Sequence, residues 1–192
     1  MQDSDSISTT LLARVRKQEP EAWQRFVDLF GPTVYRWCRA AAIEKDEAGD
    51  VVQDVFLAVA KNVQRFDREK ASGSFTAWIA SIARNKIHDH YRRLARRPIA
   101  RGGTAAQMSI AELPEPVSKE EVIEAQRKLP RRAMELVRAE FENRTWSAFW
   151  KTVVEGRPTG DVADELAMNV ASVYQAKSRI LRRLRQETEG FL

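Results

Sequence analysis

Hydrophobic residues recur at intervals of three and four along most of this 192-residue chain, and that spacing is typical of amphipathic helices. One series runs from Trp23 through Phe26 and Val27 to Phe30, and another from Ala48 to Val59. No segment shows a convincing alternation of apolar and polar residues, the pattern of a half-buried strand. The pattern therefore predicts an all-α fold.

Several of the predicted helices are preceded by residues that favour helix starts, either polar caps or a first-turn proline. We expect such starts at Thr9 or Thr10, Pro20, Asp46, Ser74 and Asn169. Gly31 and Pro32 follow the series that ends at Phe30, so one helix is expected to end there and another to begin.

The helical pattern stops between Arg96 and about Lys119. This stretch contains Arg97-Pro98, Gly102-Gly103 and Leu113-Pro114-Glu115-Pro116, which disfavour regular structure. We therefore expect two small helical domains, residues 8–97 and 120–190, joined by a flexible linker over residues 98–119.

The net charge of +5 and the sequence pI of about 9.5 favour an anionic partner only weakly. Cys38 is the single cysteine, so no intramolecular disulfide and no cysteine-based metal site is expected. The first residues are acidic and polar, unlike a signal peptide, and no apolar run has the length of a membrane span. We expect a cytoplasmic protein.

Residues 158–179 have the pattern of a helix-turn-helix. Val162, Ala163 and Leu166 would form the buried side of a short first helix, and Ala167 and Met168 would form the turn. Such turns often have a glycine in a left-handed conformation where this chain has Ala167. The outward side of the second helix carries small polar groups, an aromatic ring and cations, which suit a major groove. The residues expected to contact duplex DNA are Asn169, Ala171, Ser172, Tyr174, Gln175, Lys177, Ser178, Arg179, Arg182 and Arg183. An ordinary helical hairpin with a basic surface is the alternative.

The first half of the chain has a separate charge asymmetry. Residues 44–54 are strongly acidic, whereas residues 84–101 are strongly basic. The basic segment contains His88, His90 and Tyr91, and Trp78 lies shortly before it. Cations beside aromatic rings suit nucleic acid, because cations hold the backbone and the rings stack on unpaired bases.

Three segments together resemble a known family. They are Asp50-Val51-Val52-Gln53-Asp54-Val55-Phe56, then Phe66-Asp67, and then residues 75–93, which begin Phe75-Thr76-Ala77-Trp78-Ile79 and include Ile82-Ala83-Arg84-Asn85. They resemble the second conserved region of extracytoplasmic-function sigma factors, and the match extends from about Leu11 to Arg97. Leu129-Pro130-Arg131 is similar to the usual opening of the family's fourth region but lies unusually far upstream of the helix-turn-helix. The Trp- and Phe-rich residues 141–149 are similar to a divergent subset, and we expect these aromatic residues to be core.

The resemblance implies a transcription-initiation subunit. Asp50, Gln53, Asp54 and Phe56 would dock on the clamp helices of the largest RNA polymerase subunit, and the second-largest subunit would be bound through its flap. The minus-ten promoter element would be recognised and melted by Arg68, Lys70, Ser74, Trp78, Arg84, Asn85, Lys86, Tyr91, Arg92 and Arg93. The helix-turn-helix would recognise the minus-thirty-five element as duplex, the linker would pass the active-site channel, and an anti-sigma factor is a family-level expectation.

Other functions are less consistent with the sequence. It contains no nucleophile motif and no phosphate-binding glycine loop, so we expect no catalytic residues and no cofactor. His88-Asp89-His90 resembles a metal site, but residues two apart on a helix point in different directions. Two alternatives stay open: a helix-turn-helix regulator that acts without docking on polymerase, and an interaction module whose basic helices bind an acidic protein.

Overall fold

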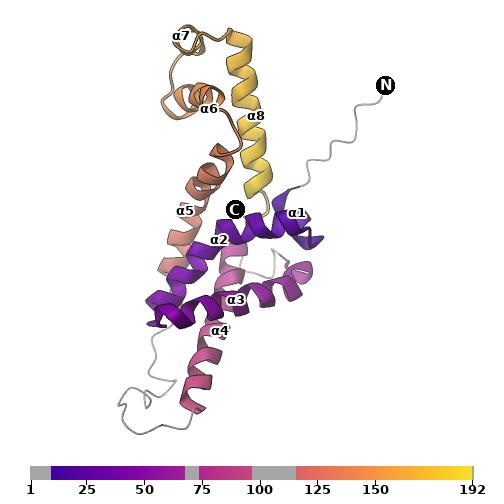
Figure 1. Cartoon of the computed structure of the whole chain (residues 1–192), viewed down its shortest axis with the longest axis vertical. Helices are drawn as coiled ribbons and strands as arrows, with labels where there is room; N and C mark the ends of the chain where they lie inside the picture. Colours follow the sequence, from indigo (N-terminus) through magenta and orange to yellow (C-terminus); the bar gives the residue numbers. More distant parts are fainter. Residues whose placement is uncertain (1–9, 68–73, 97–115, 192) are drawn as a thin grey trace. The chain divides into compact units, whose positions relative to one another are not determined.

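The computed structural model describes residues 10–67, 74–96 and 116–191, in which all regular structure is helical (Figure 1). The elements are α1 (Leu11–Arg16), α2 (Pro20–Ala40), α3 (Lys45–Asn62), the 3-10 turn η1 (Val63–Arg65), α4 (Phe75–Arg96), α5 (Lys119–Arg138), α6 (Asn143–Phe149), the π-helical turn η3 (Trp150–Val154), α7 (Thr159–Glu165) and α8 (Val170–Thr188). The predicted all-α fold is confirmed. Within these ranges, no helix is both long enough and apolar enough to cross a membrane.

The chain divides into two compact bodies. The N-terminal body contains residues 14–128 with 191–192, and the C-terminal body contains residues 1–13 with 129–190. Helix α5 contributes to both, because its first turns, up to Lys128, belong to the N-terminal body. The sequence had predicted these turns as part of the second domain. Most of the predicted linker lies outside the described residues.

The N-terminal body is built from α2, α3 and α4, which pack against one another. Phe26 on α2 lies at the centre of its core and is fully buried. The centroid of its ring is 5.0 Å from that of Phe30, 5.7 Å from that of Phe56 and 5.8 Å from that of Phe75. Two of these pairs meet edge to face, an arrangement that adds to the stabilisation from burial. The core therefore joins all three helices through one aromatic cluster.

The expected break at Gly31 and Pro32 is wrong, because α2 continues through both residues to Ala40. Proline removes one backbone donor from a helix interior. Here the buried side of α2 stays in register on both sides of Pro32, with Phe30 before it and Val34 and Trp37 after it. Burial of this continuous face outweighs the local cost, and Pro32 itself is exposed.

Three of the predicted helix caps are confirmed. The side-chain oxygens of Thr10, Ser74 and Asn169 accept hydrogen bonds from backbone amides three residues ahead, at 3.3, 3.3 and 2.6 Å. Helix α3 differs, because it begins at Lys45 after Glu44 and has no side-chain cap. Asp46 lies inside the first turn, where its charge favours the helix dipole.

The C-terminal body is held by α8, which packs on α6 and α7. Ala148 and Val162 share one buried cluster with Val173 and Ala176, and a second cluster contains Val137, Trp146, Phe149 and Ile180. The predicted core role of Trp146 and Phe149 is confirmed. Trp150, in the π-helical turn, is instead 38% exposed.

The turn between α7 and α8 contains a residue in the left-handed conformation. Ala167 has a φ of 47°. The amide of Met168 donates to the carbonyl of Ala163 at 2.8 Å, and that of Ala167 to Asp164 at 3.2 Å. These paired bonds end α7 in the manner of a Schellman motif, which usually has glycine at this position. The turn thus directs the chain into α8, which Asn169 caps.

Candidate nucleic-acid interface

The outer side of α3 presents most of the residues predicted to dock on polymerase. Asp50 and Gln53 are exposed, and Asp54 is partly exposed. Phe56 is only 6% exposed, and its ring packs against those of Trp23 and Phe26. Phe56 therefore holds α3 on the core.

The outer side of α4 carries the residues predicted to read single-stranded DNA. Trp78 is half-buried, with its ring centroid 5.2 Å from that of Phe66 and 5.1 Å from that of Phe75. Asn85 and Arg92 are exposed farther along the helix. Because residues three, four and seven apart share a helix face, Trp78 and Asn85 lie on one side of α4.

Other predicted residues of this surface have structural partners. Asp89 lies 3.7 Å from the ammonium of Lys86 and 2.9 Å from the guanidinium of Arg92. The hydroxyl of Tyr91 donates to the carbonyl of Ala41, and burial, followed by the nearby Cys38, Glu44 and Glu47, raises the pKa of Tyr91. Tyr91 thus ties α4 to the end of α2. Arg68 and Lys70 lie outside the described residues.

An ionic contact joins α3 and α4 between the two predicted surfaces. Both terminal nitrogens of Arg93 lie 3.2 Å from Oδ2 of Asp54, and Nε2 of His90 lies 3.4 Å from Oε2 of Glu47. A hollow of about 280 Å³ beside them is lined by Glu47, Asp50, Asp54, His90, Arg93 and Leu94. A residue predicted to bind polymerase and one predicted to bind DNA therefore share one ion pair.

Among the residues that the structure describes, no group of three His, Cys, Asp or Glu side chains is placed to hold a metal ion, and this includes the His88-Asp89-His90 triplet. His90 is nearly buried and faces Glu47 on α3, whereas Asp89 pairs with Lys86 and Arg92. The role of His90 between two helices could not be derived from the triplet, because it depends on which side of α4 packs on α3.

The outer side of α8 presents a polar and basic surface. Tyr174 is 56% exposed, and Ser172 and Lys177 are half-buried. The remaining predicted contacts that are exposed are Asn169, Ala171, Gln175, Ser178, Arg179 and Arg182. These residues occupy successive turns of one helix, as contact with a groove requires.

Arg183 differs from the other predicted contacts of α8. Its Nε lies 2.7 Å from Oε2 of Glu140, and its Nη1 lies 2.6 Å from Oε2 of Glu187, whose side chain is fully buried. Burial opposes the charge of Arg183, but hydrogen bonds and charges from the two carboxylates outweigh it, and the pKa of Arg183 is raised. Arg183 therefore links α8 to the end of α5 and compensates a buried carboxylate.

Replacing Arg183 with methionine should destabilise the protein by about 2 kcal/mol, since the ion pair between Arg183 and the buried carboxylate of Glu187 would be lost. Arg182→Met is the matched control, because Arg182 is exposed on the same helix and its loss should change stability by less than about 0.5 kcal/mol. Urea denaturation of both variants measures the difference. Equal stabilities would show that the Glu187 contact contributes nothing.

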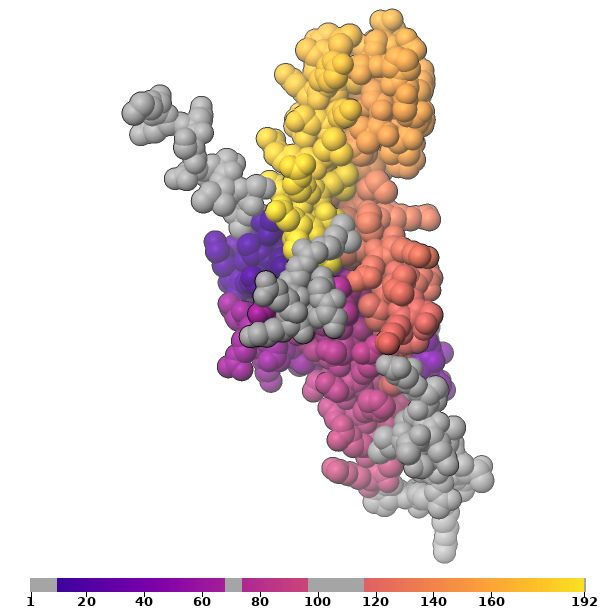
Figure 2. Space-filling view, turned by 180° about the vertical axis from the view of Figure 1, so that it is seen from behind, coloured from indigo at the N-terminus to yellow at the C-terminus, as the bar shows by residue number. Residues whose placement is uncertain are grey.

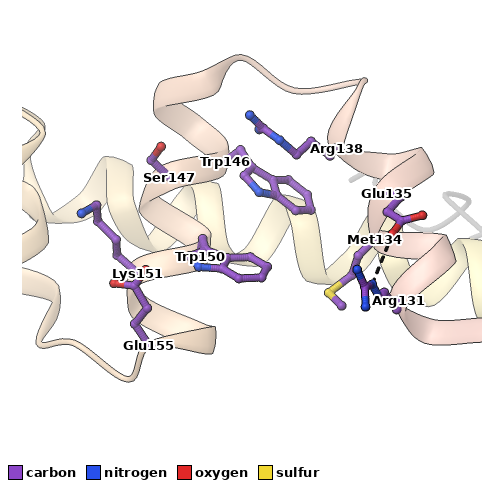
Figure 3. Close-up of a pocket in the computed structure, with 9 residues that line it drawn as sticks. All are labelled: Arg131, Met134, Glu135, Arg138, Trp146, Ser147, Trp150, Lys151 and Glu155. Carbon is purple, nitrogen blue, oxygen red and sulfur yellow. Dashed lines mark hydrogen bonds and ion pairs between the residues drawn. The ribbon is translucent and has the colours of Figure 1, made fainter. Parts of the chain in front are cut away.

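A groove of about 560 Å³ lies in the C-terminal body between α5 and α6 with the π-helical turn (Figure 3). The rings of Trp146 and Trp150 and the side chain of Met134 form its apolar part. The guanidinium of Arg138 lies 5.5 Å from the centroid of the Trp146 ring, and Arg131 pairs with Glu135. The sequence predicts the aromatic residues of this segment only as core. The exposure of Trp150 depends on the π-helical register, which has no clear signal in the sequence.

Two side-chain ion pairs also hold the π-helical turn in place. Glu165 on α7 lies 2.7 Å from Nζ of Lys151 and 2.6 Å from Nη1 of Arg157. Hydrogen bonds from Lys151 and then Arg157 lower the pKa of Glu165. The groove wall and the first helix of the helix-turn-helix are therefore connected.

Comparison with known proteins supports the assignment of the first body. Residues 26–97 match the family model Sigma-70 region 2. The chain is 32% identical over 91 residues to the ECF RNA polymerase sigma factor BldN of Streptomyces coelicolor, covering 47% of this chain and 34% of that protein. It is 27% identical over 82 residues to the ECF RNA polymerase sigma factor SigW of Bacillus subtilis, covering 43% and 42%. These matches span less than half the length of either relative.

One solved structure was also matched, described as CnrH in complex with the cytosolic domain of CnrY. It covers 91% of this chain and 92% of that chain, with 22% identity and a TM-score of 0.38. The motif on α3, the tryptophan and basic residues of α4 and the family match all fall in the same body. Residues 26–97 therefore match sigma-70 region 2, and over this part of the chain the relatives it resembles are extracytoplasmic-function sigma factors.

Proposed function

We propose that this protein is an RNA polymerase sigma factor, which binds the core enzyme and directs initiation at specific promoters. The observation that carries the proposal is the pairing of an acidic outer side on α3 with a basic, tryptophan-bearing outer side on α4, in a body that matches sigma-70 region 2. The two surfaces suit two partners of opposite charge.

Docking on the clamp helices of the largest subunit would use Asp50, Gln53 and Asp54. Their position on one exposed side of a helix allows electrostatic attraction to a basic surface, which raises the rate and specificity of association. Phe56 supports this proposal indirectly, because it fixes α3 on the aromatic core.

Recognition of the minus-ten element would use the outer side of α4. Trp78 offers a partly exposed ring on which an unpaired base can stack, and Asn85 offers an amide for its edge. Arg92 and the residues around it supply cations for the phosphates. Capture of an unstacked base would favour the open promoter without ATP hydrolysis.

The C-terminal body would recognise the minus-thirty-five element through α8, with Tyr174, Gln175 and Arg179 toward the major groove. The flap of the second-largest subunit would dock in the groove of Trp146, Trp150 and Met134, where exposed apolar surface lies beside cations. An anti-sigma partner stays a family-level prediction.

The main alternative is a helix-turn-helix regulator that binds duplex DNA without polymerase. Mobility shifts with a promoter fragment, with and without core polymerase, separate the two functions. A sigma factor should shift the fragment only, or far more strongly, with core enzyme present. Run-off transcription from the protein's own upstream region would then identify a promoter. Tight, specific binding without core, and no association with core, would exclude the sigma function.

Arg93→Gln should have opposite effects on the two activities. It removes the partner of Asp54, so binding to core polymerase should rise about two- to fivefold at low salt, in keeping with the small energy of an exposed ion pair. Affinity of the holoenzyme for promoter DNA should fall, because one cation is lost. Fluorescence anisotropy with labelled core and labelled promoter measures both.

Arg92→Gln is the matched control for this variant. Arg92 directly precedes Arg93 on α4. It pairs with Asp89 of the same helix, so this ion pair does not join α4 to α3. It should weaken DNA binding and leave core binding unchanged. If Arg93→Gln behaves like Arg92→Gln in both assays, the pair with Asp54 does not connect the two surfaces.

A further inference from the structure

We propose that residues 116–126, here called the covering segment, occupy part of the minus-ten reading surface in the free protein and must leave it before DNA binds. The inference rests on the proposed function, because the covered residues are those assigned to the minus-ten element. The occupant is thus a part of this chain.

The covering segment belongs to the N-terminal body and is held there by apolar contacts. Val117 is fully buried, and Val122 and Ala125 are nearly so. Val122 and Ala125 are three residues apart and lie on one side of α5, whereas Ile123 and Glu124 are exposed. In Figure 2 the surface of α5, in salmon, borders that of α4, in magenta. The first turns of α5 therefore pack as an amphipathic helix.

Two polar contacts tie the covering segment to predicted DNA-reading residues. Nε of Arg84 donates to the carbonyl of Val117 at 2.8 Å. The side-chain amide of Gln126 donates to Oγ of Ser74, the residue that caps α4. One donor and one acceptor among the residues predicted to read DNA, Arg84 and Ser74, are thus engaged by the chain itself.

The covering segment is also negatively charged. Glu120, Glu121 and Glu124 lie in the first turns of α5. The pKa of Glu124 is lowered, mainly by a hydrogen bond from Lys128 and further by the charge of Arg36 on α2. Carboxylates at this position would repel the phosphates of an approaching DNA strand.

The helical part of the covering segment, from Lys119 on, has a well-defined start. The amide of Glu121 donates to Oγ of Ser118 at 3.2 Å, and the amide of Ser118 donates to Oε2 of Glu121 at 2.8 Å. This reciprocal pair is a capping box, which stabilises a helix start locally. The segment can therefore leave α4 as a formed helix, without unfolding first.

A reducible cross-link tests the proposal directly. In the variant Ser74→Cys/Gln126→Cys, a short bis-methanethiosulfonate reagent would join the two introduced thiols and hold the covering segment on α4. The native Cys38 should not compete, because it is buried and its burial raises the pKa of the thiol to about 11. The assay is run-off transcription and binding of a minus-ten single-stranded oligonucleotide by the reconstituted holoenzyme.

Cross-linking should lower both signals at least about tenfold, and reduction of the same sample should restore them. Glu124→Cys/Lys128→Cys is the matched control, because these residues form an ion pair within α5 and their cross-link leaves the segment free to move. Arg36→Cys/Glu124→Cys is a second lock, which uses no residue assigned to DNA and so covers the case in which Ser74→Cys alone impairs binding.

The possible outcomes separate the two levels of the proposal. If both locked proteins bind the oligonucleotide as well as their reduced forms, the covering segment does not control access and the inference is wrong. If the unmodified protein fails to join core polymerase, the proposed sigma function itself is wrong, whatever the cross-links do.

Discussion

Replacing Asp50 with lysine is expected to lower the affinity for core RNA polymerase by a factor on the order of tens to a hundred. Asp50 is exposed on the outer side of α3 and lies next to the hollow that also contains Asp54. The variant would place a cation against a basic partner surface, and a like-charge contact at an interface costs several kcal/mol, where about 1.4 kcal/mol is a factor of ten. Surface plasmon resonance with immobilised core enzyme measures the change.

Asn85→Ala is the opposite control for Asp50→Lys. Asn85 is exposed on α4 and has no part in the α3 surface. Its loss should reduce open-complex formation, measured by permanganate footprinting, with little effect on core binding. Circular dichroism should show native helix content for both variants. The two-surface proposal would be refuted if Asp50→Lys bound core normally while Asn85→Ala did not.

Phe26→Ala is expected to destabilise the protein by about 3–5 kcal/mol, the usual cost of removing a large aromatic from a close-packed core. The side chain of Phe26 is fully buried, and its ring contacts residues from α2, α3 and α4. The cavity would therefore weaken all three helix contacts together. That loss is a large part of the stability of a small domain.

Chemical denaturation followed by tryptophan fluorescence measures this loss. Leu57→Ala is the matched control, because Leu57 is 59% exposed on α3 and its truncation should cost less than about 0.5 kcal/mol. If Phe26→Ala costs no more than Leu57→Ala, the aromatic cluster is not the centre of the core.

The all-helical fold and the division into two bodies could be predicted from local signals. Intervals of three and four mark the buried sides of helices, and the caps at Thr10, Ser74 and Asn169 act within one turn. The left-handed turn at Ala167 also depends on neighbouring residues only. The break expected at Pro32 failed because a local rule was outweighed by burial of a face that continues across it.

For the candidate site, too, the sequence predicts features on a single helix but not the contacts between helices. Spacing on a single helix places Asp50 with Gln53 and Trp78 with Asn85, and no knowledge of packing is needed. It does not show that Arg93 of α4 meets Asp54 of α3, or that Arg84 binds the carbonyl of Val117. Those partners are 39 and 33 residues apart in the chain.

The sequence by itself thus determined the helices, their buried sides, and the motifs that resemble extracytoplasmic-function sigma factors. Only the tertiary structure decided which charges are free to meet a partner: Arg183 neutralises Glu187, Arg93 shares a contact with Asp54, and residues 116–126 lie on α4. The physical reason is range. Helix periodicity and caps depend on residues within a few positions, whereas the environment of a charge depends on how distant helices pack.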